Sequence, residues 1–178
     1  MILLLGIAGA GKGTQGKLLV EKNGYSYLST GEMLRRYATP AQQERMLSGE
    51  LLDDDEIIMM VDKALTTLQE AQKCILDGFP RSIVQTDWLL EQVKEGRFPL
   101  TAIFNLAASE DVVKDRLLAR GRSDDTVEAV TKRFAEYEEV TLPILEHLRA
   151  ANIPVYEVDA MRDPNTIHDD IMNHLEKN

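Results

Sequence analysis

Short apolar runs of β-strand length recur along the chain and alternate with longer segments of helical spacing. A strand buried on both faces is a continuous apolar run, whereas an amphipathic helix repeats its apolar residues every three to four positions. Parallel strands need a long crossover, which is usually a helix. The pattern therefore predicts an α/β fold with a five-stranded parallel sheet, whose strands are residues 2–5, 25–28, 74–76, 102–106 and 155–158.

Polar residues mark where several helices should begin. Ser29, followed three residues later by Glu32, forms a capping-box pattern. The acidic run 53–56 places negative charge in a first helical turn, where the helix dipole favours it. Ser109 precedes two acidic residues, and Asp163 precedes a proline that suits the first helical position. Each of these signals predicts a helix that begins at the next residues.

A long helical segment in the last third of the chain contains a proline. From residue 125 to about residue 151 the apolar residues follow one approximate helical stripe, but Pro143 lies within it. Proline inside a helix removes a backbone donor and collides with the preceding turn. We therefore expect a kink or a break there. No repeat, low-complexity tract or flexible linker divides the sequence, so residues 1–178 are expected to form a single domain.

The composition excludes several classes of protein. The 178 residues are 44% hydrophobic and 28% charged, which is ordinary for a soluble globular protein. The single cysteine, Cys74, excludes a disulfide framework and indicates a reducing compartment, most simply the cytoplasm. The net charge of -10 argues against a nucleic-acid or membrane-surface binder, because both need a basic face. The apolar N-terminal run is too short for a signal peptide or a membrane span.

Residues 6–15, GIAGAGKGTQ, directly follow the first predicted strand. Gly6, Gly11 and Lys12 match the phosphate-binding pattern G-x-x-x-x-G-K. Glycines let backbone N–H groups converge on an anion, the helix N-terminus adds partial positive charge, and the lysine adds a full charge. A glycine-rich turn without a ligand is the alternative. The general pattern places Ser or Thr after the lysine, whereas this chain has Gly13 and only then Thr14.

Two further segments carry candidate chemistry. DGFPR at 77–81 places a carboxylate, Asp77, at the end of a predicted strand, where it could hold Mg²⁺ through the water shell of the ion. Arg116 and Arg120 are four residues apart and therefore share a helix face, and Arg122 follows just beyond. An ordinary turn and a solvated charged face are the alternative interpretations of these segments.

The motifs together are similar to those of nucleoside monophosphate kinases, and of adenylate kinases in particular. Gly13 before Thr14 belongs to the variant G-x-x-G-x-G-K-G-T of that family. The resemblance runs from residue 1 to about residue 170 in the order of the family. It implies a P-loop kinase three-layer sandwich with an AMP-binding segment at 29–58 and a minimal lid at 120–124. The segments that carry it are residues 6–15, 28–35, 49–55, 76–85, 115–125, 131–143 and 158–164.

The resemblance implies the roles of individual residues. Asp77 and Thr14 would hold Mg²⁺ through water, and the amide of Gln85 suits a two-point match with adenine. The catalytic residues would be Lys12, Arg81, Arg120, Arg122 and Arg133. ATP would be bound by Gly9, Ala10, Gly11, Lys12, Gly13, Thr14, Arg116, Arg120 and Arg162. AMP would be bound by Thr30, Gly31, Arg35, Glu50, Leu51, Leu52, Gly78, Phe79, Pro80, Arg81, Gln85, Arg122 and Arg133.

The implied reaction is the reversible Mg²⁺-dependent transfer of a phosphoryl group from ATP to AMP, which gives two ADP. The AMP phosphate is already anionic, so the reaction needs no general base. This agrees with the three histidines, which lie outside every motif and are expected on the surface or in helices. A UMP/CMP-type kinase is an alternative, but such enzymes tend to have alanine at Thr30 and asparagine at Gln85. A non-catalytic adenine-nucleotide-binding regulatory module is the other alternative. We expect a monomer that binds ATP, AMP and ADP, with no nucleic-acid or membrane partner.

The chain departs from the family pattern in two places. Between Arg35 and Gly49 it is shorter than typical members, so the AMP-covering helices should be abbreviated. Only Gly121 separates Arg120 from Arg122, which leaves no room for an inserted lid or for the four-ligand zinc site of some members. We therefore expect no zinc.

Overall fold

One parallel sheet forms the centre of the protein. The computed structural model describes residues 1–47, 52–68, 73–120, 131–132, 134–135 and 137–177, with the side chains at 44–47 and 120 left out. The strands follow the order β2-β3-β1-β4-β5, and all neighbours pair in parallel. The predicted fold class is thus confirmed. The strands are β1 (Ile2–Leu5), β2 (Ser26–Ser29), β3 (Cys74–Asp77), β4 (Ala102–Ala107) and β5 (Val155–Asp159).

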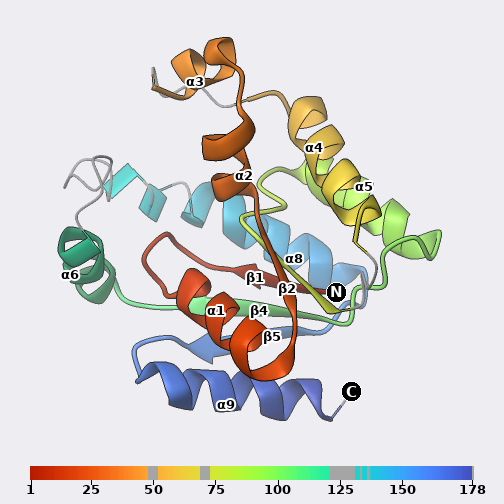
Figure 1. The fold of residues 1–178 in the computed structure, drawn as a ribbon. Helices are drawn as coiled ribbons and strands as arrows, with labels where there is room; N and C mark the ends of the chain where they lie inside the picture. Colours follow the sequence, from red (N-terminus) through yellow and green to blue (C-terminus); the bar gives the residue numbers. More distant parts are fainter. Residues whose placement is uncertain (48–51, 69–72, 121–130, 133, 136, 178) are drawn as a thin grey trace.

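The helices lie on both faces of this sheet (Figure 1). Helices α1 and α9 pack on one face, and α4, α5 and α8 pack on the other. The described helices are α1 (Lys12–Asn23), α2 (Thr30–Tyr37), α3 (Pro40–Leu47), α4 (Asp54–Thr66), α5 (Ile83–Lys94), α6 (Glu110–Arg120), α8 (Leu142–Ala150) and α9 (Pro164–Leu175), with a π-helical turn at Tyr137–Thr141. None of the described helices is long and apolar enough to cross a membrane.

Strand alternation divides the core into two layers. Ile2 and Leu4 of β1 pack in the cluster beneath α1 and α9, whereas Leu3 and Leu5 pack in the cluster beneath α5 and α8. Successive side chains of a strand point to opposite faces, so a continuous apolar run is needed when both faces are covered. All four residues of β1 are buried, as this packing requires.

The helix starts follow the polar signals of the sequence. The side chain of Ser29 accepts a hydrogen bond from the backbone N–H of Glu32 at the start of α2. Asp53 begins α4 with a complete capping box, and Asp163 caps α9 ahead of its first-turn proline. Pro143 lies in the first turn of α8, directly after the π-helical turn. The helical backbone changes from π to α just before this proline and continues through it. The kink or break expected there therefore stays a prediction.

Candidate active site

The glycine-rich loop joins the end of β1 to the start of α1. Gly11 is the N-cap of α1 with a φ of 107°, in the left-handed region that glycine tolerates. As a glycine, this N-cap residue has no side-chain oxygen to accept from the first N–H groups of the helix. The Nζ of Lys12 donates hydrogen bonds to the carbonyl oxygens of Gly6, at 2.6 Å, and Ile7, at 3.0 Å. A helix N-terminus and a full positive charge therefore meet at one place, which suits a phosphate chain.

The loop lies at a point where the chain changes direction across the sheet. β1 and β3 are neighbours, but the chain leaves β1 toward β2 and leaves β3 toward β4. Their following helices, α1 and α5, cover opposite faces of the sheet. Ligands of open α/β sheets bind at such a switch point, outside the carboxyl ends of the strands. Both Lys12, after β1, and Asp77, at the end of β3, lie at this edge.

Asp77 is buried, with 8% of its surface exposed, at the end of β3. It pairs in register with Leu4 of β1 and with Ser29 of β2. Its Oδ2 accepts a hydrogen bond of 2.6 Å from the hydroxyl of Tyr27. Among the described residues, its Oδ1 has no hydrogen-bond partner although it is buried. A carboxylate oxygen without a partner costs free energy unless a water or an ion satisfies it.

That oxygen fits a hydrated magnesium ion. Mg²⁺ prefers oxygen ligands and keeps several of its waters, so a single carboxylate beside a phosphate chain suffices to hold it. Thr14 lies in the first turn of α1 and is exposed. In the described ranges, no group of three or more His, Cys, Asp or Glu side chains could hold a metal ion directly. One carboxylate and one hydroxyl are oxygen donors of the kind that suit a metal held mainly by phosphates and water.

The hydroxyl of Tyr27 remains a hydrogen-bond donor in this site. Burial raises the pKa of Tyr27 well above its ordinary value, and the negative charge of Asp77 raises it further. The phenol is therefore protonated at neutral pH. The sequence analysis missed this residue. Gly16 could have indicated it, because an isolated glycine inside a helix often marks a place where another side chain packs closely, and here that side chain is Tyr27.

The DGFPR turn is held from two sides. The Oγ1 of Thr30 donates to the carbonyl oxygen of Gly78, at 2.8 Å, and more weakly to that of Asp77, at 3.2 Å. The Nε of Arg81 donates to the same Gly78 carbonyl oxygen at 3.0 Å. Phe79 is buried and packs edge-on against Trp88, with ring centroids 5.8 Å apart. The turn thus presents the exposed Arg81 at the edge of the sheet.

Gln85 joins this turn to α4. It is buried, with 4% of its surface exposed. Its Oε1 accepts a hydrogen bond of 2.7 Å from the backbone N–H of Arg81, and its Nε2 donates one of 2.8 Å to Asp54. Both ends of the predicted adenine-binding amide therefore have partners within the protein. In the sequence, Asp54 is noted only as part of the acidic run 53–56, and no local pattern there points to Gln85.

Two predicted ATP-side arginines tie loops together. The Nη1 of Arg116 donates to the carbonyl oxygen of Ala160 at 2.8 Å and, at 3.4 Å, to that of Ala10 in the glycine-rich loop. Arg162 bonds the carbonyl oxygen of Asp159 and the carboxylate of Asp170. These contacts fix the segment between β5 and α9 beside the glycine-rich loop.

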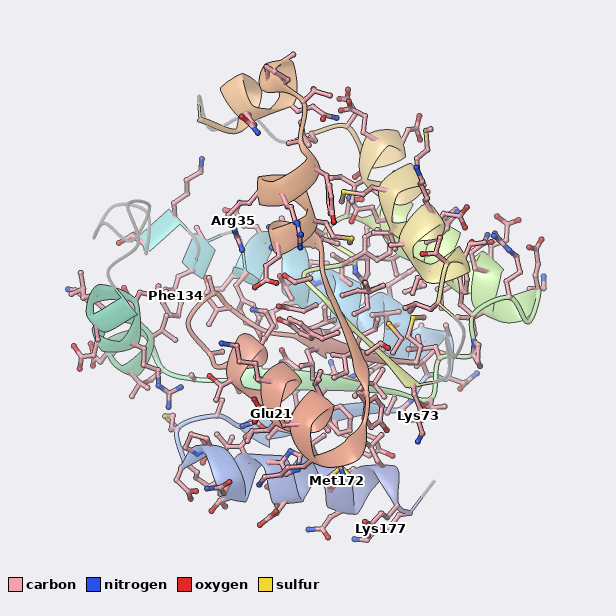
Figure 2. The ribbon with its side chains drawn as sticks, in the orientation of Figure 1. Glu21, Arg35, Lys73, Phe134, Met172 and Lys177 are labelled. Carbon is pink, nitrogen blue, oxygen red and sulfur yellow. The ribbon has the colours of Figure 1, made fainter. Side chains whose placement is uncertain are left out.

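The remaining predicted site residues divide into two groups. Gly31 and the exposed Arg35 lie on α2 (Figure 2), and Leu52 is buried just before α4. Glu50, Leu51, Arg122 and Arg133 lie outside the described residues, as does the side chain of Arg120, whose backbone ends α6. The three histidines lie on α8 and α9, as expected, and His168 is buried.

Comparison with known proteins places the chain in a family. The family model described as Adenylate kinase matches residues 4–153. An adenylate kinase of Prochlorococcus marinus strain MIT 9301 is 39% identical over 180 residues, which cover 98% of this chain and 97% of the relative. An adenylate kinase of Corynebacterium urealyticum is 35% identical and covers 99% of both chains. One of Corynebacterium aurimucosum is 40% identical over 86% of this chain and 88% of its own. The chain belongs to the adenylate kinase family.

Proposed function

We propose that this chain catalyses the reversible Mg²⁺-dependent transfer of a phosphoryl group from ATP to AMP, giving two ADP. The observation that carries the proposal is that Lys12, which follows β1, and the buried Asp77, which ends β3, lie at the same edge of the sheet, at its switch point. The family of the chain supports the same function. The enzyme is a phosphotransferase of the adenylate kinase family. We further propose which of its residues bind the two nucleotides and which take part in catalysis.

The ATP side is assigned to the glycine-rich loop and three arginines. Backbone N–H groups of residues 9–14 would receive the phosphates, and the Nζ of Lys12 would exchange its contacts with the loop carbonyls for phosphate oxygens. Asp77 and Thr14 would hold Mg²⁺ through its waters; bound there, the ion neutralises charge on the phosphates. The arginines proposed on the ATP side are Arg116, Arg120 and Arg162.

The AMP side is assigned to α2, the approach to α4 and the DGFPR turn. Arg81 and Arg35 are exposed cations that would pair with the AMP phosphate. Thr30 holds the Gly78 carbonyl and so fixes the turn that presents Arg81. Gln85 would bind adenine. The further proposed AMP-side residues are Gly31, Glu50, Leu51, Leu52, Phe79, Pro80, Arg122 and Arg133.

Catalysis on this assignment rests on alignment and charge. The AMP phosphate is an anionic nucleophile, so no side chain has to remove a proton from it. Lys12 and the arginines Arg81, Arg120, Arg122 and Arg133 would hold donor and acceptor in line and stabilise the charge of the transferring group. Water must be excluded from the transfer, and closure of the segments 29–58 and 120–124 over the nucleotides would do so.

We further propose that residues 1–178 act as a single domain and as a monomer. The described strands share one sheet, which supports a single folding unit. Cys74 is a buried free thiol, which is consistent with a reducing compartment such as the cytoplasm.

A coupled assay with Mg²⁺-ATP and each of AMP, UMP, CMP and GMP tests the function. We expect AMP to be turned over with the highest kcat/KM. Faster turnover of UMP or CMP would favour the pyrimidine-nucleotide kinase instead. Nucleotide binding without turnover of any acceptor would favour a regulatory module.

A further inference from the structure

The hydrogen bond from Tyr27 makes the two oxygens of the Asp77 carboxylate different from each other. The phenol donates to Oδ2 at 2.6 Å, whereas Oδ1 is buried without a partner among the described residues. Tyr27 lies on β2 and Asp77 ends the neighbouring strand β3, so the contact is made across the sheet. A phenol bonded to one oxygen restrains rotation of the carboxyl group about its Cβ–Cγ bond. The free oxygen is then held in one direction.

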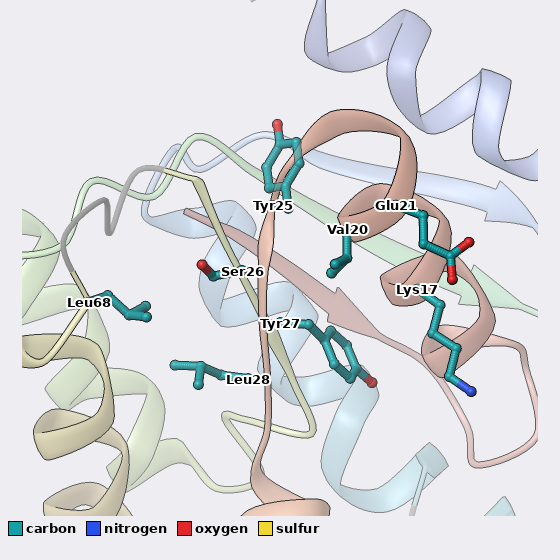
Figure 3. A pocket seen from close by; sticks show the side chains of 8 residues that line it. All are labelled: Lys17, Val20, Glu21, Tyr25, Ser26, Tyr27, Leu28 and Leu68. Atoms are coloured by element: carbon teal, nitrogen blue, oxygen red, sulfur yellow. The ribbon is translucent and has the colours of Figure 1, made fainter.

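Gly16 of α1 makes room for this tyrosine. A Cβ atom at Gly16 would overlap the Cε2 atom of Tyr27 and lie 2.6 Å from its Cδ2 atom, which is far inside contact distance. Glycine is unfavourable inside a helix relative to alanine, so its presence in the middle of α1 needs a reason. Close approach of the ring to the α1 backbone provides one. Figure 3 shows Tyr27 reaching from β2 toward α1. Tyr25 packs on the same face of the sheet, but its hydroxyl points away from that of Tyr27.

We propose that Tyr27, seated against Gly16, is a positioning residue for the Mg²⁺-ATP site. Its hydroxyl occupies Oδ2 of Asp77 and thereby directs Oδ1 to the water shell of the ion. The inference rests on the role proposed above for Asp77. Residues that orient a metal-binding group from behind typically change metal affinity or activity by roughly 10- to 100-fold when they are replaced.

The test is the affinity of Mn²⁺, a spectroscopic substitute for Mg²⁺, for the enzyme–ATP complex, measured by electron paramagnetic resonance of the free ion. We expect Tyr27→Phe, which keeps the ring and removes the hydroxyl, to weaken Mn²⁺ binding about tenfold. The matched control is Tyr25→Phe, the same change on a tyrosine whose hydroxyl points away from that of Tyr27, and it should bind Mn²⁺ as the unmodified protein does. Metal-free ATP should bind all three proteins equally.

Gly16→Ala provides a second route to the same site. It keeps the hydroxyl but its methyl group displaces the ring, so we expect a similar loss of Mn²⁺ affinity. The double variant Gly16→Ala/Tyr27→Phe should lose little more than either single variant, because both break one hydrogen bond. Independent, additive losses would overturn the shared cause.

Asp77→Asn separates this inference from the function on which it rests. If Asp77→Asn weakens Mn²⁺ binding and Tyr27→Phe leaves it within twofold of the unmodified protein, Tyr27 is not a positioning residue and Asp77 keeps its role. If Asp77→Asn itself leaves Mn²⁺ affinity unchanged, the proposed metal role of Asp77 is wrong. A lower melting temperature of Tyr27→Phe with unchanged Mn²⁺ affinity would show a purely structural hydrogen bond and would overturn the inference.

Discussion

The amide of Gln85 in α5 donates a hydrogen bond of 2.8 Å to Asp54 in the first turn of α4, 31 residues earlier in the chain. Its oxygen accepts from the backbone N–H of Arg81 at 2.7 Å. Each end of the amide can take a second partner, because Nε2 carries two hydrogens and Oε1 carries two lone pairs. An adenine base bound by Gln85 would therefore share this amide with Asp54 and with the backbone of Arg81. The side chain of Gln85 would then connect the bound base to the start of α4 and to the DGFPR turn.

Replacement of Gln85 should impair the use of AMP selectively. We expect Gln85→Ala to raise the KM for AMP about tenfold or more, because a two-point hydrogen-bonded match with adenine contributes roughly 1–3 kcal/mol. The KM for UMP should change less. Gln92→Ala is the matched control on the same helix, and steady-state assays should find its AMP kinetics unchanged. Equal losses for AMP and UMP would instead mean that Gln85 acts only by holding the turn at Arg81.

The sequence predicts the sheet and the helix starts because both are local. Four consecutive apolar residues at Ile2–Leu5 are sufficient to predict a strand covered on both faces. Ser29, Asp53 and Asp163 predict helix starts because a capping side chain bonds to N–H groups two or three residues away. The strand at 26–29 lies one residue later than the predicted 25–28, since the apolar run does not mark where pairing ends.

The contacts within the site depend on register and could not be predicted in the same way. Tyr27 reaches Asp77 only because β2 pairs with β3 so that Ser29 lies opposite Asp77. Neither strand contains a signal for that register. The resemblance implies that Arg116 lies on the ATP side, but its hydrogen bond to Ala160 requires the loop after β5 to lie beside α6. The motifs thus predict which residues belong to the site, and the topology decides which of the described ones are in contact.

Removal of the Lys12 ammonium should abolish most of the catalysis and little of the stability. We expect Lys12→Ala to lower kcat by roughly 10²–10³-fold, because a preorganised charge at the transferring phosphoryl group is lost. Its hydrogen bonds to the carbonyl oxygens of Gly6 and Ile7 are only partly buried, so their loss should lower the melting temperature by no more than a few degrees. Lys17→Ala, an exposed lysine of the same helix, is the control. Turnover near that of the unmodified enzyme would contradict the assignment of Lys12.

His168 should make the protein less stable in mild acid. Burial lowers its pKa below the ordinary value of 6.5, and the positive charge of Lys22 acts in the same direction, against Asp169. The unfolded chain then binds the proton more tightly than the folded protein. Above pH 6.5 the histidine is neutral in both states, so its contribution to stability is complete there and is lost as the pH falls below that value.

Urea unfolding at pH 7.5 and pH 5.5 measures this effect. We expect the free energy of unfolding to fall between the two conditions, and to fall less in His168→Gln, which cannot take up the proton. His174→Gln, on the same helix, should keep the full decrease. If His168→Gln and the unmodified protein lose the same free energy between the two pH values, then His168 is not responsible for the decrease.

The variants Gly78→Ala and Gly96→Ala should distinguish the cost of backbone strain from the effect of a methyl group on the site. Both glycines are in the left-handed region, with φ of 77° and 72°. A Cβ atom at Gly96 meets no atom within 4 Å, whereas one at Gly78 would lie 2.7 Å from the Oγ1 of Thr30 and 3.1 Å from the Nη2 of Arg81. We expect Gly96→Ala to reduce the free energy of unfolding by about 1–2 kcal/mol, which is the cost of the left-handed conformation for an L-residue. Its AMP kinetics should stay unchanged.

Gly78→Ala should carry the same strain and a further loss. The methyl group displaces the Thr30 hydroxyl from the turn and pushes the Arg81 guanidinium from its place, so the total decrease should reach about 2–4 kcal/mol. The KM for AMP should rise at least tenfold, because Arg81 is the proposed partner of the AMP phosphate and a charge-assisted hydrogen bond contributes roughly 1.5–3 kcal/mol. Chemical denaturation and AMP titrations on both variants measure the two effects. Similar stability losses with an unchanged KM in Gly78→Ala would show that the turn tolerates the methyl group and that Arg81 does not depend on it for its position.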